Sequence, residues 1–356
     1  MQPLIHPLEG QTSTLGMRVL IVSDAWRPQV NGVVRTLESL IKEASSFGVE
    51  VIILAPDSFR SVPMPTYPEI RLSLTGLKEV SQRIDTIDPD AIHIATEGPL
   101  GFFARQYCLL RQRPFTTCYH TRFPEYIAAR APIPTSLTYS ILRWFHNAAS
   151  ATLVATKSLQ DELKSYGFSK TQTWRRGIDL DVFMQGTKRD LGLQGPIFLY
   201  VGRVAVEKNI ESFLNLDLPG TKIILGDGPA RGKLQTDFPD ALFLGLKSGQ
   251  DLADLYASAD VFVFPSRSDT FGLVMLEALA AGTPVAAYPI MGPKDILEGS
   301  GCGIMNEDLR LAALSALEIP RENCKKYASQ YSMNESASHL FTQIDSIRRN
   351  GRSLKI

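Results

Sequence analysis

The sequence is poor in cysteine and has no long apolar run, and each absence narrows the class of protein. Its four cysteines (Cys108, Cys118, Cys302 and Cys324) form no CxxC pair. Such usage argues against a zinc site or a disulfide framework and is typical of a reducing compartment. No stretch approaches the roughly 18 apolar residues of a membrane-spanning helix, and residues 1–16 do not resemble a signal peptide. We therefore expect a cytoplasmic protein that is neither exported nor threaded through a bilayer.

Net charge is also absent, because 37 basic residues balance 37 acidic ones. A neutral chain lacks the overall positive field that attracts nucleic acid, so nucleic acid is not an expected partner. The 44% hydrophobic and 21% charged content is that of an ordinary globular protein. A length of 356 residues favours two domains of usual size over one enlarged core.

Short apolar segments alternate with helical patterns along the whole chain. Apolar segments lie at 17–24, 49–56, 91–96, 115–121 and 151–156, and again at 196–203, 221–228, 241–246, 260–266 and 283–289. Strands that are apolar throughout and alternate with helices indicate parallel sheets covered on both faces. The sequence therefore predicts an α/β protein with two Rossmann-like, doubly wound domains facing each other across a cleft.

The predicted domain boundaries follow from this alternation. Residues 1–16 form an extension, 17–185 an N-terminal domain, 186–332 a C-terminal domain, and 333–356 a final helix and tail, whose docking site the sequence does not reveal. The halves meet near 181–196, where glycines and Pro196 are expected to loosen the chain.

Ligands of parallel sheets bind at the carboxyl ends of the strands, so the loops there carry the candidate residues. The first such loop holds Gly32 but no GxGxxG, which argues against a dehydrogenase. Gly32 precedes a helix, where backbone N–H groups can approach an anion, although it could also be a turn glycine. His120 ends another apolar segment, where it can face the cleft or be merely structural.

A basic region lies between Leu100 and Leu180, where eleven Lys or Arg accompany only four acidic residues. Interleaved aromatic residues suit a surface that lies against anionic lipid headgroups. The alternative is a core of aromatic residues beneath a solvated basic face. The candidate acceptor or membrane residues are Arg105, Arg122, Tyr126 and Arg130.

Two cations follow the first strand of the second half. Arg203 comes directly after Gly202, and Lys208 lies five positions further on. Together they can hold the two ends of a diphosphate, although an ion pair with Glu207 is an alternative. The next strand ends in Gly226, Asp227 and Gly228, whose glycines are expected to leave room for a flat base.

The segment 266–282 is the most informative in the chain. A helix predicted to begin near Gly272 directs its free N–H groups and its positive dipole end at the strand edge, where an anion is expected. Glu277 lies about 7.5 Å along that helix, which places its carboxylate near the hydroxyls of an attached ribose. An unpaired buried charge is otherwise costly. Asp269, before the helix, can reach a sugar.

These motifs together resemble the retaining glycosyltransferases of family 4, which have the two-domain GT-B fold. The resemblance rests on the spacing of Asp269 and Glu277, on Gly202, Arg203 and Lys208, on the GDGP turn at Gly226, and on NGV at Gly32. The segments VNGVVRTL, TEGPLG, YHTRFPEY and RGID further resemble bacterial and plant enzymes that glycosylate diacylglycerol or phosphatidylinositol.

The resemblance implies a role for each candidate residue. Arg203 and Lys208 would neutralise the diphosphate of a nucleotide-sugar donor, and Glu277 would bind its ribose. Asp269 and the backbone of Phe271, Gly272 and Leu273 would hold the sugar and the β-phosphate, and His120 would contact the donor sugar. The family motif commonly begins with glutamate where this chain has Asp269.

The implied reaction breaks an anomeric C–O bond, so the diphosphate gains negative charge that cations and a helix terminus can stabilise. The leaving phosphate oxygen takes the acceptor's proton on the same face, which retains configuration. No Asp-x-Asp motif follows a strand, so we expect no metal and no other cofactor. The expected partners are a UDP-sugar donor carrying glucose, glucuronate or galactose, a lipid acceptor such as diacylglycerol, and the anionic inner face of the cytoplasmic membrane. The alternatives are a GDP-mannose-dependent mannosyltransferase, a nucleotide-sugar epimerase and a non-catalytic sugar-binding protein.

Overall fold

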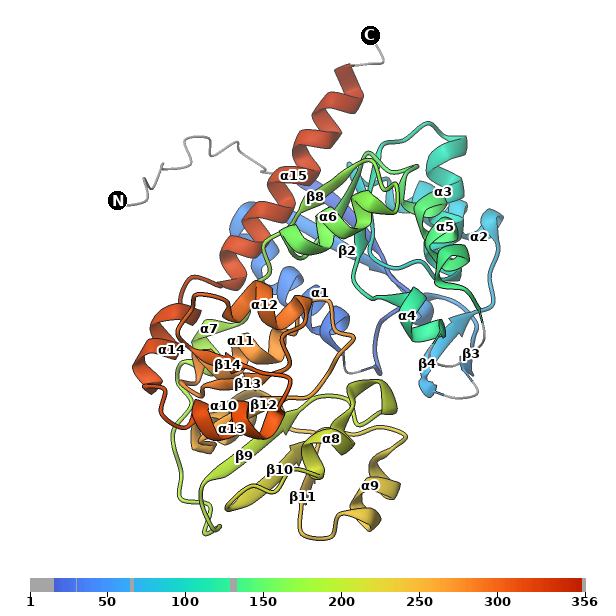
Figure 1. The fold of residues 1–356 in the computed structure, drawn as a ribbon. Helices are drawn as coiled ribbons and strands as arrows, with labels where there is room; N and C mark the ends of the chain where they lie inside the picture. Colours follow the sequence, from blue (N-terminus) through green and yellow to red (C-terminus); the bar gives the residue numbers. More distant parts are fainter. Residues whose placement is uncertain (1–15, 30, 65–66, 129–132, 354–356) are drawn as a thin grey trace.

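The computed structural model describes residues 16–29, 31–64, 67–128 and 133–353, and it contains two parallel sheets of six strands each (Figure 1). The first sheet has the order β2-β1-β5-β6-β7-β8 and the second β11-β10-β9-β12-β13-β14. The strands of the first are β1 Met17–Val22, β2 Val49–Leu54, β5 Ala91–Ile94, β6 Phe115–Tyr119, β7 Ala151–Val154 and β8 Thr171–Thr173; those of the second are β9 Ile197–Val201, β10 Thr221–Leu225, β11 Leu242–Gly245, β12 Val261–Phe264, β13 Val285–Ala287 and β14 Gly303–Met305.

Both sheets are doubly wound, which confirms the predicted fold class. The strand order reverses between β1 and β5 in the first sheet and between β9 and β12 in the second. Helices cover both faces of each sheet, so central strands such as β5, β6, β9 and β12 are buried along their whole length. Ligands of such sheets bind beyond the carboxyl ends of the strands at the reversal point. The fold thereby marks two loop clusters, one in each half.

The helices of the first half are α1 Gly32–Ala44, α2 Leu77–Ile87, α3 Pro99–Leu110, α4 Phe123–Ala128, α5 Thr135–His146 and α6 Lys157–Ser165. Those of the second are α7 Leu180–Phe183, α8 Ile210–Leu214, α9 Arg231–Asp237, α10 Gly249–Ser258, α11 Leu273–Ala280, α12 Met291–Leu297, α13 Leu309–Ala316 and α14 Arg321–Ala328. Single 3-10 turns lie at Ser45–Phe47, Pro56–Ser58 and Val206–Lys208. Within the described ranges, none of the helices combines the length and the apolar character needed to cross a bilayer.

The last helix, α15 (Met333–Ser353), returns to the first half, which answers where it docks (Figure 1). Its Leu340, Phe341 and Ile344 are buried in one cluster with residues of β1 and α1. The indole N–H of Trp174 donates to the carbonyl of Ser336 at 3.0 Å. The helix therefore completes the core of the first half although it follows the second half in sequence. The domain boundaries themselves stay a prediction.

Some elements were not predicted from the sequence. An antiparallel hairpin of β3 (Ser61–Met64) and β4 (Tyr67–Ser73) extends from the first half. The edge strands β8 and β14 have three residues each, and β8 is rich in polar residues. Short or polar strands carry a weak periodic signal, so they are missed by pattern alone.

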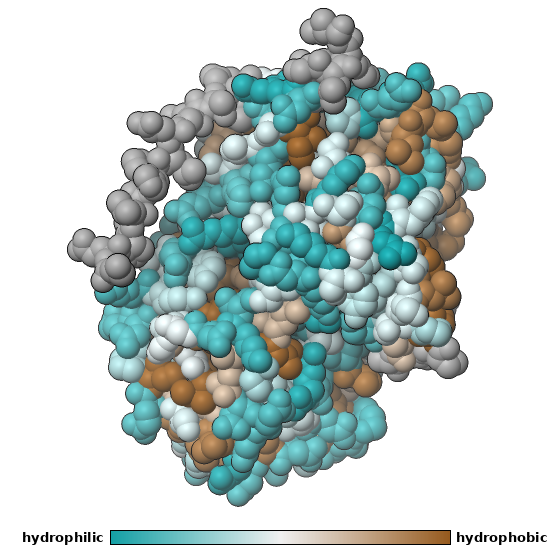
Figure 2. Space-filling view, turned by 45° about the horizontal axis from the view of Figure 1, so that its top comes forward, coloured by the Kyte–Doolittle hydropathy of each residue, from teal (hydrophilic) through white to brown (hydrophobic). Residues whose placement is uncertain are grey.

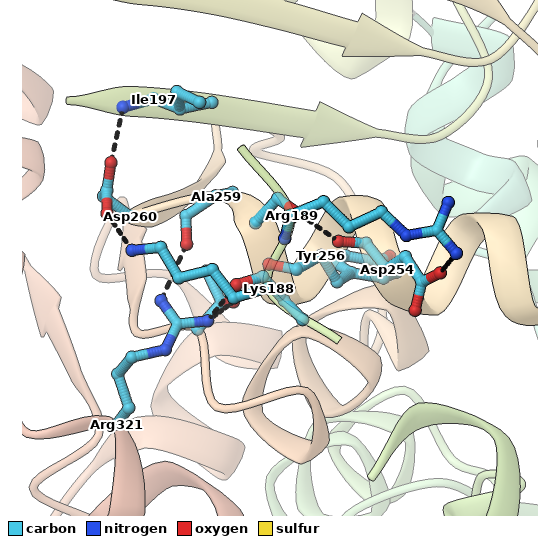
Figure 3. Close-up of polar contacts among 11 residues, drawn as sticks. Lys188, Arg189, Ile197, Asp254, Tyr256, Ala259, Asp260 and Arg321 are labelled. Atoms are coloured by element: carbon cyan, nitrogen blue, oxygen red, sulfur yellow. Dashed lines mark hydrogen bonds and ion pairs between the residues drawn. The ribbon is translucent and has the colours of Figure 1, made fainter. Parts of the chain in front are cut away.

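The segment that joins the halves is held rather than loose (Figure 3). Asp254 accepts the backbone N–H of Thr187 at 2.8 Å and pairs with Arg189. Asp260 accepts the N–H of Ile197 at 2.8 Å and pairs with Lys188 at 3.1 Å. The expectation of a loosened chain at 181–196 is therefore corrected, because α10 and the start of β12 bind it through two carboxylates.

Candidate active site

The two loop clusters at the strand reversal points lie against each other, and they bring together residues from both halves. The hydroxyl of Thr270, in the loop after β12, donates to the carbonyl of His120 at 3.0 Å. A Cβ added to Gly32, the first residue of α1, would lie 4.0 Å from Leu273, the first residue of α11. The N-termini of α1 and α11 therefore meet at one place, and both carry the positive end of a helix dipole. This place suits an anionic ligand.

Neither the backbone conformation nor the packing at position 32 requires a glycine there. Its φ lies outside the left-handed region, and ordinary van der Waals contact with Leu273 is all that an added Cβ would make. The Asn31 side chain accepts the N–H groups of Val33 and Val34, both at 3.0 Å, and so caps the helix. The turn-glycine interpretation is therefore not supported, and a close approach of a ligand stays the better explanation.

By contrast, close packing requires glycine after β10, where residues 226 and 228 lie against the loop that follows β9. A Cβ added to Gly226 would lie 1.8 Å from the carbonyl oxygen of Gly202, and one on Gly228 would lie 2.4 Å from that of Val204. Both glycines also have positive φ. Packing against the neighbouring backbone therefore requires both glycines, and the expectation that they leave room for a flat base stays a prediction. Asp227 is exposed and pairs with Arg231 at 3.2 Å.

These contrasting glycines give a testable prediction. Gly226→Ala should lower the melting temperature sharply or abolish folding, because a backbone contact of 1.8 Å cannot be relieved by a side-chain rotation. Gly32→Ala should melt like the wild type and lose activity, because its new methyl group occupies the ligand side of the site. Thermal unfolding of both purified variants tests this. Equal melting temperatures for the two variants would contradict the packing argument.

Lys208 and Asp269, two of the predicted site residues, form an ion pair. The Nζ of Lys208 lies 2.5 Å from Oδ1 of Asp269, and both side chains are 19% exposed. The alternative that the sequence left open, an ion pair of Arg203 or Lys208 with Glu207, stays a prediction. The pair sits just before α11 and keeps a cation at the terminus of that helix. Arg203 is half-buried in the adjoining loop, and its carbonyl accepts the hydroxyl of Tyr200 at 2.9 Å.

Glu277 is 5% exposed and its carboxylate has two partners. The hydroxyl of Tyr256 donates to Oε2 at 2.9 Å, and Nη1 of Arg35 lies 3.3 Å from Oε1. Burial, together with the Glu277 charge, raises the pKa of Tyr256 well above its ordinary value. Arg35 comes from α1 of the other half, a contact that sequence reasoning missed because 242 positions separate the two residues.

The TEGPLG segment, which follows β5, is organised by Asp24. Its carboxylate accepts the N–H of Leu100 at 2.9 Å, that of Gly101 at 3.2 Å and the hydroxyl of Thr96 at 3.0 Å. Burial raises the pKa of Asp24 above its ordinary value. A Cβ on Gly101 would lie 1.9 Å from the carbonyl of Thr96, so this glycine serves packing. Asp24 therefore caps α3, which sequence reasoning also missed.

His120 lies at the end of β6 beside a buried arginine. Nη2 of Arg176 is 2.9 Å from Nδ1 of His120, and Nε2 is buried without a partner in the described part of the chain. Burial, with a smaller contribution from the Arg176 charge, lowers the pKa of His120 well below its ordinary value. The histidine is therefore neutral at physiological pH.

Two of the four acceptor or membrane candidates, Arg105 and Arg122, have side chains that the structure describes, and both contact other parts of the protein. Arg105 is 4% exposed, donates to the carbonyls of Trp144 and Phe145, and stacks on the Trp144 ring at 3.8 Å. The expectation that Arg105 faces a lipid is wrong, because the interior backbone uses its guanidinium. Arg122 pairs with Glu125 at 3.1 Å and Glu162 at 2.5 Å, so its charge is compensated. Tyr126 belongs to α4, but its side chain, like Arg130, lies outside the described residues.

Each half of the chain matches a known family of glycosyltransferase domains. The family model for Glycosyltransferase Family 4 matches residues 30–182, and that for glycosyl transferases group 1 matches residues 195–317. A solved structure of Anabaena HepE in complex with UDP and glucose superimposes with a TM-score of 0.70 at 17% identity, covering 93% of this chain and 100% of that one. The fold is therefore GT-B.

Several curated relatives cover most of the chain. The GDP-mannose-dependent alpha-mannosyltransferase of Mycolicibacterium smegmatis is 30% identical over 317 residues, which is 81% of this chain and 84% of that protein. The sulfoquinovosyl transferase SQD2 of Arabidopsis thaliana is 32% identical over 75% of this chain and 58% of its own length. The alpha-monoglucosyldiacylglycerol synthase of Streptococcus pneumoniae is 26% identical over 76% and 71%. The chain belongs to glycosyltransferase family 4.

Proposed function

We propose that the protein transfers a hexose from a UDP-sugar to a lipid acceptor such as diacylglycerol, with retention of configuration. The observation that carries this proposal is the grouping of Lys208, Asp269 and Glu277 around α11, opposite the start of α1. A diphosphate between the two helix N-termini would meet two positive dipole ends and the cations Arg203 and Lys208. A ribose attached to it would reach Glu277.

The charges favour breaking the bond to the leaving diphosphate. As the anomeric C–O bond lengthens, negative charge grows on the phosphate oxygen, so fixed cations stabilise the transition state more than the bound donor. Burial lowers the pKa of His120 well below its ordinary value, and Arg176 already donates to its Nδ1, so the imidazole is a poor base for the acceptor hydroxyl. The carboxylate of Glu277 already contacts Tyr256 and Arg35, so it is not a suitable base either. We propose that the leaving phosphate oxygen takes that proton, which requires attack on the same face. No metal or cofactor enters this proposal.

An apolar surface on the first half supports a lipid acceptor. It is formed by exposed side chains of α3 and α5, namely Phe102, Leu109, Leu110, Leu137, Ile141 and Trp144. Phe102 and Trp144 lie in contact, with ring centroids 6.2 Å apart. Figure 2 shows hydrophobic side chains gathered along the right-hand side of the molecule, where α3 and α5 lie in Figure 1. We propose that this surface meets the inner face of the cytoplasmic membrane.

The relatives leave two donors open for this chain. One is named for GDP-mannose and another for the product monoglucosyldiacylglycerol, while the Anabaena structure holds UDP and glucose. UDP-glucose is our first candidate donor and GDP-mannose the second.

A matrix of donors and acceptors tests the proposal. The purified protein is incubated in detergent micelles with UDP-glucose, UDP-glucuronate, UDP-galactose or GDP-mannose, each with diacylglycerol or phosphatidylinositol. Mass spectrometry of the lipid fraction should find a hexosyl lipid with an α-anomeric linkage from a UDP-sugar. A hexosyl lipid from GDP-mannose alone would favour the second donor. Release of a free or epimerised sugar with no lipid product would contradict the proposal.

The apolar surface gives a separate prediction. Replacing Leu137, Ile141 and Trp144 together with serine should weaken pelleting with phosphatidylglycerol vesicles at least about tenfold, because each apolar side chain contributes roughly 1.5–3 kcal/mol when it leaves water. The control is Leu311→Ser, which replaces a residue that is 50% exposed on α13 of the other half. Pelleting that equals the wild type in the triple variant would show that this face does not meet the membrane.

A further inference from the structure

The segment after β8 places a buried arginine directly behind His120. Arg176 is 6% exposed, and its guanidinium stacks on the ring of Trp174 with a separation of 4.0 Å. Its Nη2 donates to Nδ1 of His120 at 2.9 Å and lies 3.4 Å from the Sγ of Cys118. Trp174 is in turn held by the carbonyl of Ser336 on α15. The arginine is therefore fixed from several sides, and so is the imidazole that it contacts.

This contact determines which nitrogen of His120 carries the proton. A guanidinium has five donors, no acceptor and a permanent charge. Nδ1 of His120 must therefore accept, and the proton of the neutral ring resides on Nε2. Nε2 is buried and has no hydrogen-bond partner among the described residues. A buried N–H without a partner is costly unless a ligand supplies the acceptor.

Burial, reinforced by the charges around the ring, favours its neutral form. Arg176 faces it from the segment after β8, His93 from β5 and His146 from α5. All three are neutral or positive, and the nearby Glu97 is engaged by Nε2 of His146 at 3.0 Å. No carboxylate is recorded as a partner of His120 in the part of the chain that the structure describes. Protonation of the ring would thus add a positive charge beside a permanent one.

We propose that Arg176 is a positioning residue that fixes His120 as the neutral tautomer with its proton on Nε2, and that it thereby sets the hydrogen-bonding role of the histidine that the resemblance places beside the donor sugar. The second half of this statement rests on the proposed function, whereas the tautomer does not. A neutral donor suits a sugar that gains positive charge as its anomeric bond breaks, since an imidazolium there would oppose that charge. His120 then takes up no proton during the reaction.

Nitrogen NMR of the donor-free protein tests the tautomer without any assay of activity. The protein is labelled with ¹⁵N-histidine, and the His120 signals are identified by their loss in His120→Asn. We expect Nδ1 to be unprotonated and Nε2 protonated, unchanged between about pH 6 and pH 8. A proton on Nδ1, or a cationic ring in this range, would overturn the proposal.

Variants of Arg176 test its part in this arrangement. Arg176→Met removes the donor to Nδ1 and a neighbouring charge, so the His120 tautomer should become mixed and the pKa of the ring should rise relative to the wild type. Arg176→Lys keeps a donor and should keep the tautomer. The matched control is Arg175→Met, because Arg175 is exposed and pairs with Glu335 at 3.8 Å. If Arg176→Met does not fold, the wild type and Arg176→Lys still decide the matter.

A pH profile of transfer separates positioning from a merely structural role. Arg176→Met should lose about tenfold in kcat/KM at pH 8 and more as the pH is lowered, because a donor in the wrong tautomer or a charged ring no longer stabilises the transition state, while Arg175→Met keeps the wild-type profile. Arg176→Lys should recover most of the loss. An equal loss of kcat/KM at every pH, without recovery in Arg176→Lys, would show that Arg176 has only a structural role. Absence of transfer by the wild type would count against the proposed function and leave the NMR result standing.

Discussion

Lys208→Ala is expected to lower the turnover of sugar transfer about a hundredfold or more, as is Arg203→Ala. In the proposed function each variant removes a cation that faces the oxygen on which negative charge develops, and the loss of one such donor typically has an effect of this size. Lys208 is held at 2.5 Å by Asp269 just before α11. Its alanine variant therefore also leaves a half-buried carboxylate where the phosphate should bind. Steady-state kinetics with saturating acceptor measures the effect.

Lys188→Ala is the matched control for this prediction. Lys188 also pairs with an aspartate, Asp260 at 3.1 Å, but at the opposite, amino-terminal edge of the second sheet. The Lys188→Ala variant should transfer sugar at the wild-type rate. A near-normal rate in purified Lys208→Ala, with the wild-type melting temperature, would show that the diphosphate does not bind beside Lys208.

Glu277→Gln is expected to weaken binding of the donor nucleotide by about tenfold to a hundredfold. A carboxylate accepts two hydrogen bonds from vicinal hydroxyls, and hydrogen bonds to a charged group contribute roughly 1.5–3 kcal/mol each. Glutamine preserves the size of the side chain and an acceptor for Tyr256, so the fold should persist. Titration with UDP and with 2′-deoxy-UDP measures the effect, because the variant should no longer distinguish the two nucleotides.

Tyr256→Phe distinguishes binding of the ribose by Glu277 from the hydrogen bond that Tyr256 donates to the same carboxylate. The hydroxyl of Tyr256 contacts Glu277 inside the protein, where its ring is fully buried. Its loss should lower stability, with a much smaller effect on the ratio of UDP to 2′-deoxy-UDP affinity. A Glu277→Gln variant that still discriminates between the nucleotides would place the ribose elsewhere.

The parts of the fold that depend on local pattern could be predicted from the sequence. Apolar strands such as β1, β6, β9 and β12 are buried on both faces, so they leave an uninterrupted apolar signal. The cap of α1 by Asn31 and the start of α11 after Gly272 also follow from neighbouring residues. Two doubly wound parallel sheets, and the loops at their carboxyl ends, were accessible in this way.

The partners of the site residues were not accessible, because they come from distant segments. Arg35 reaches Glu277 across 242 positions, and Asp24 caps α3 across 76. Arg176 meets His120 only because β6 and the segment after β8 end at the same edge of the first sheet. Arg105 shows the converse error, since a cation in a basic region was used by interior carbonyls. Charge content alone does not reveal which cations face solvent.

A crystal structure of the protein with UDP or GDP tests the central claim most directly. The account predicts the diphosphate at the N-terminus of α11 within reach of Arg203 and Lys208, with the ribose hydroxyls on the carboxylate of Glu277. A nucleotide bound elsewhere, with no ribose contact to Glu277, would contradict it.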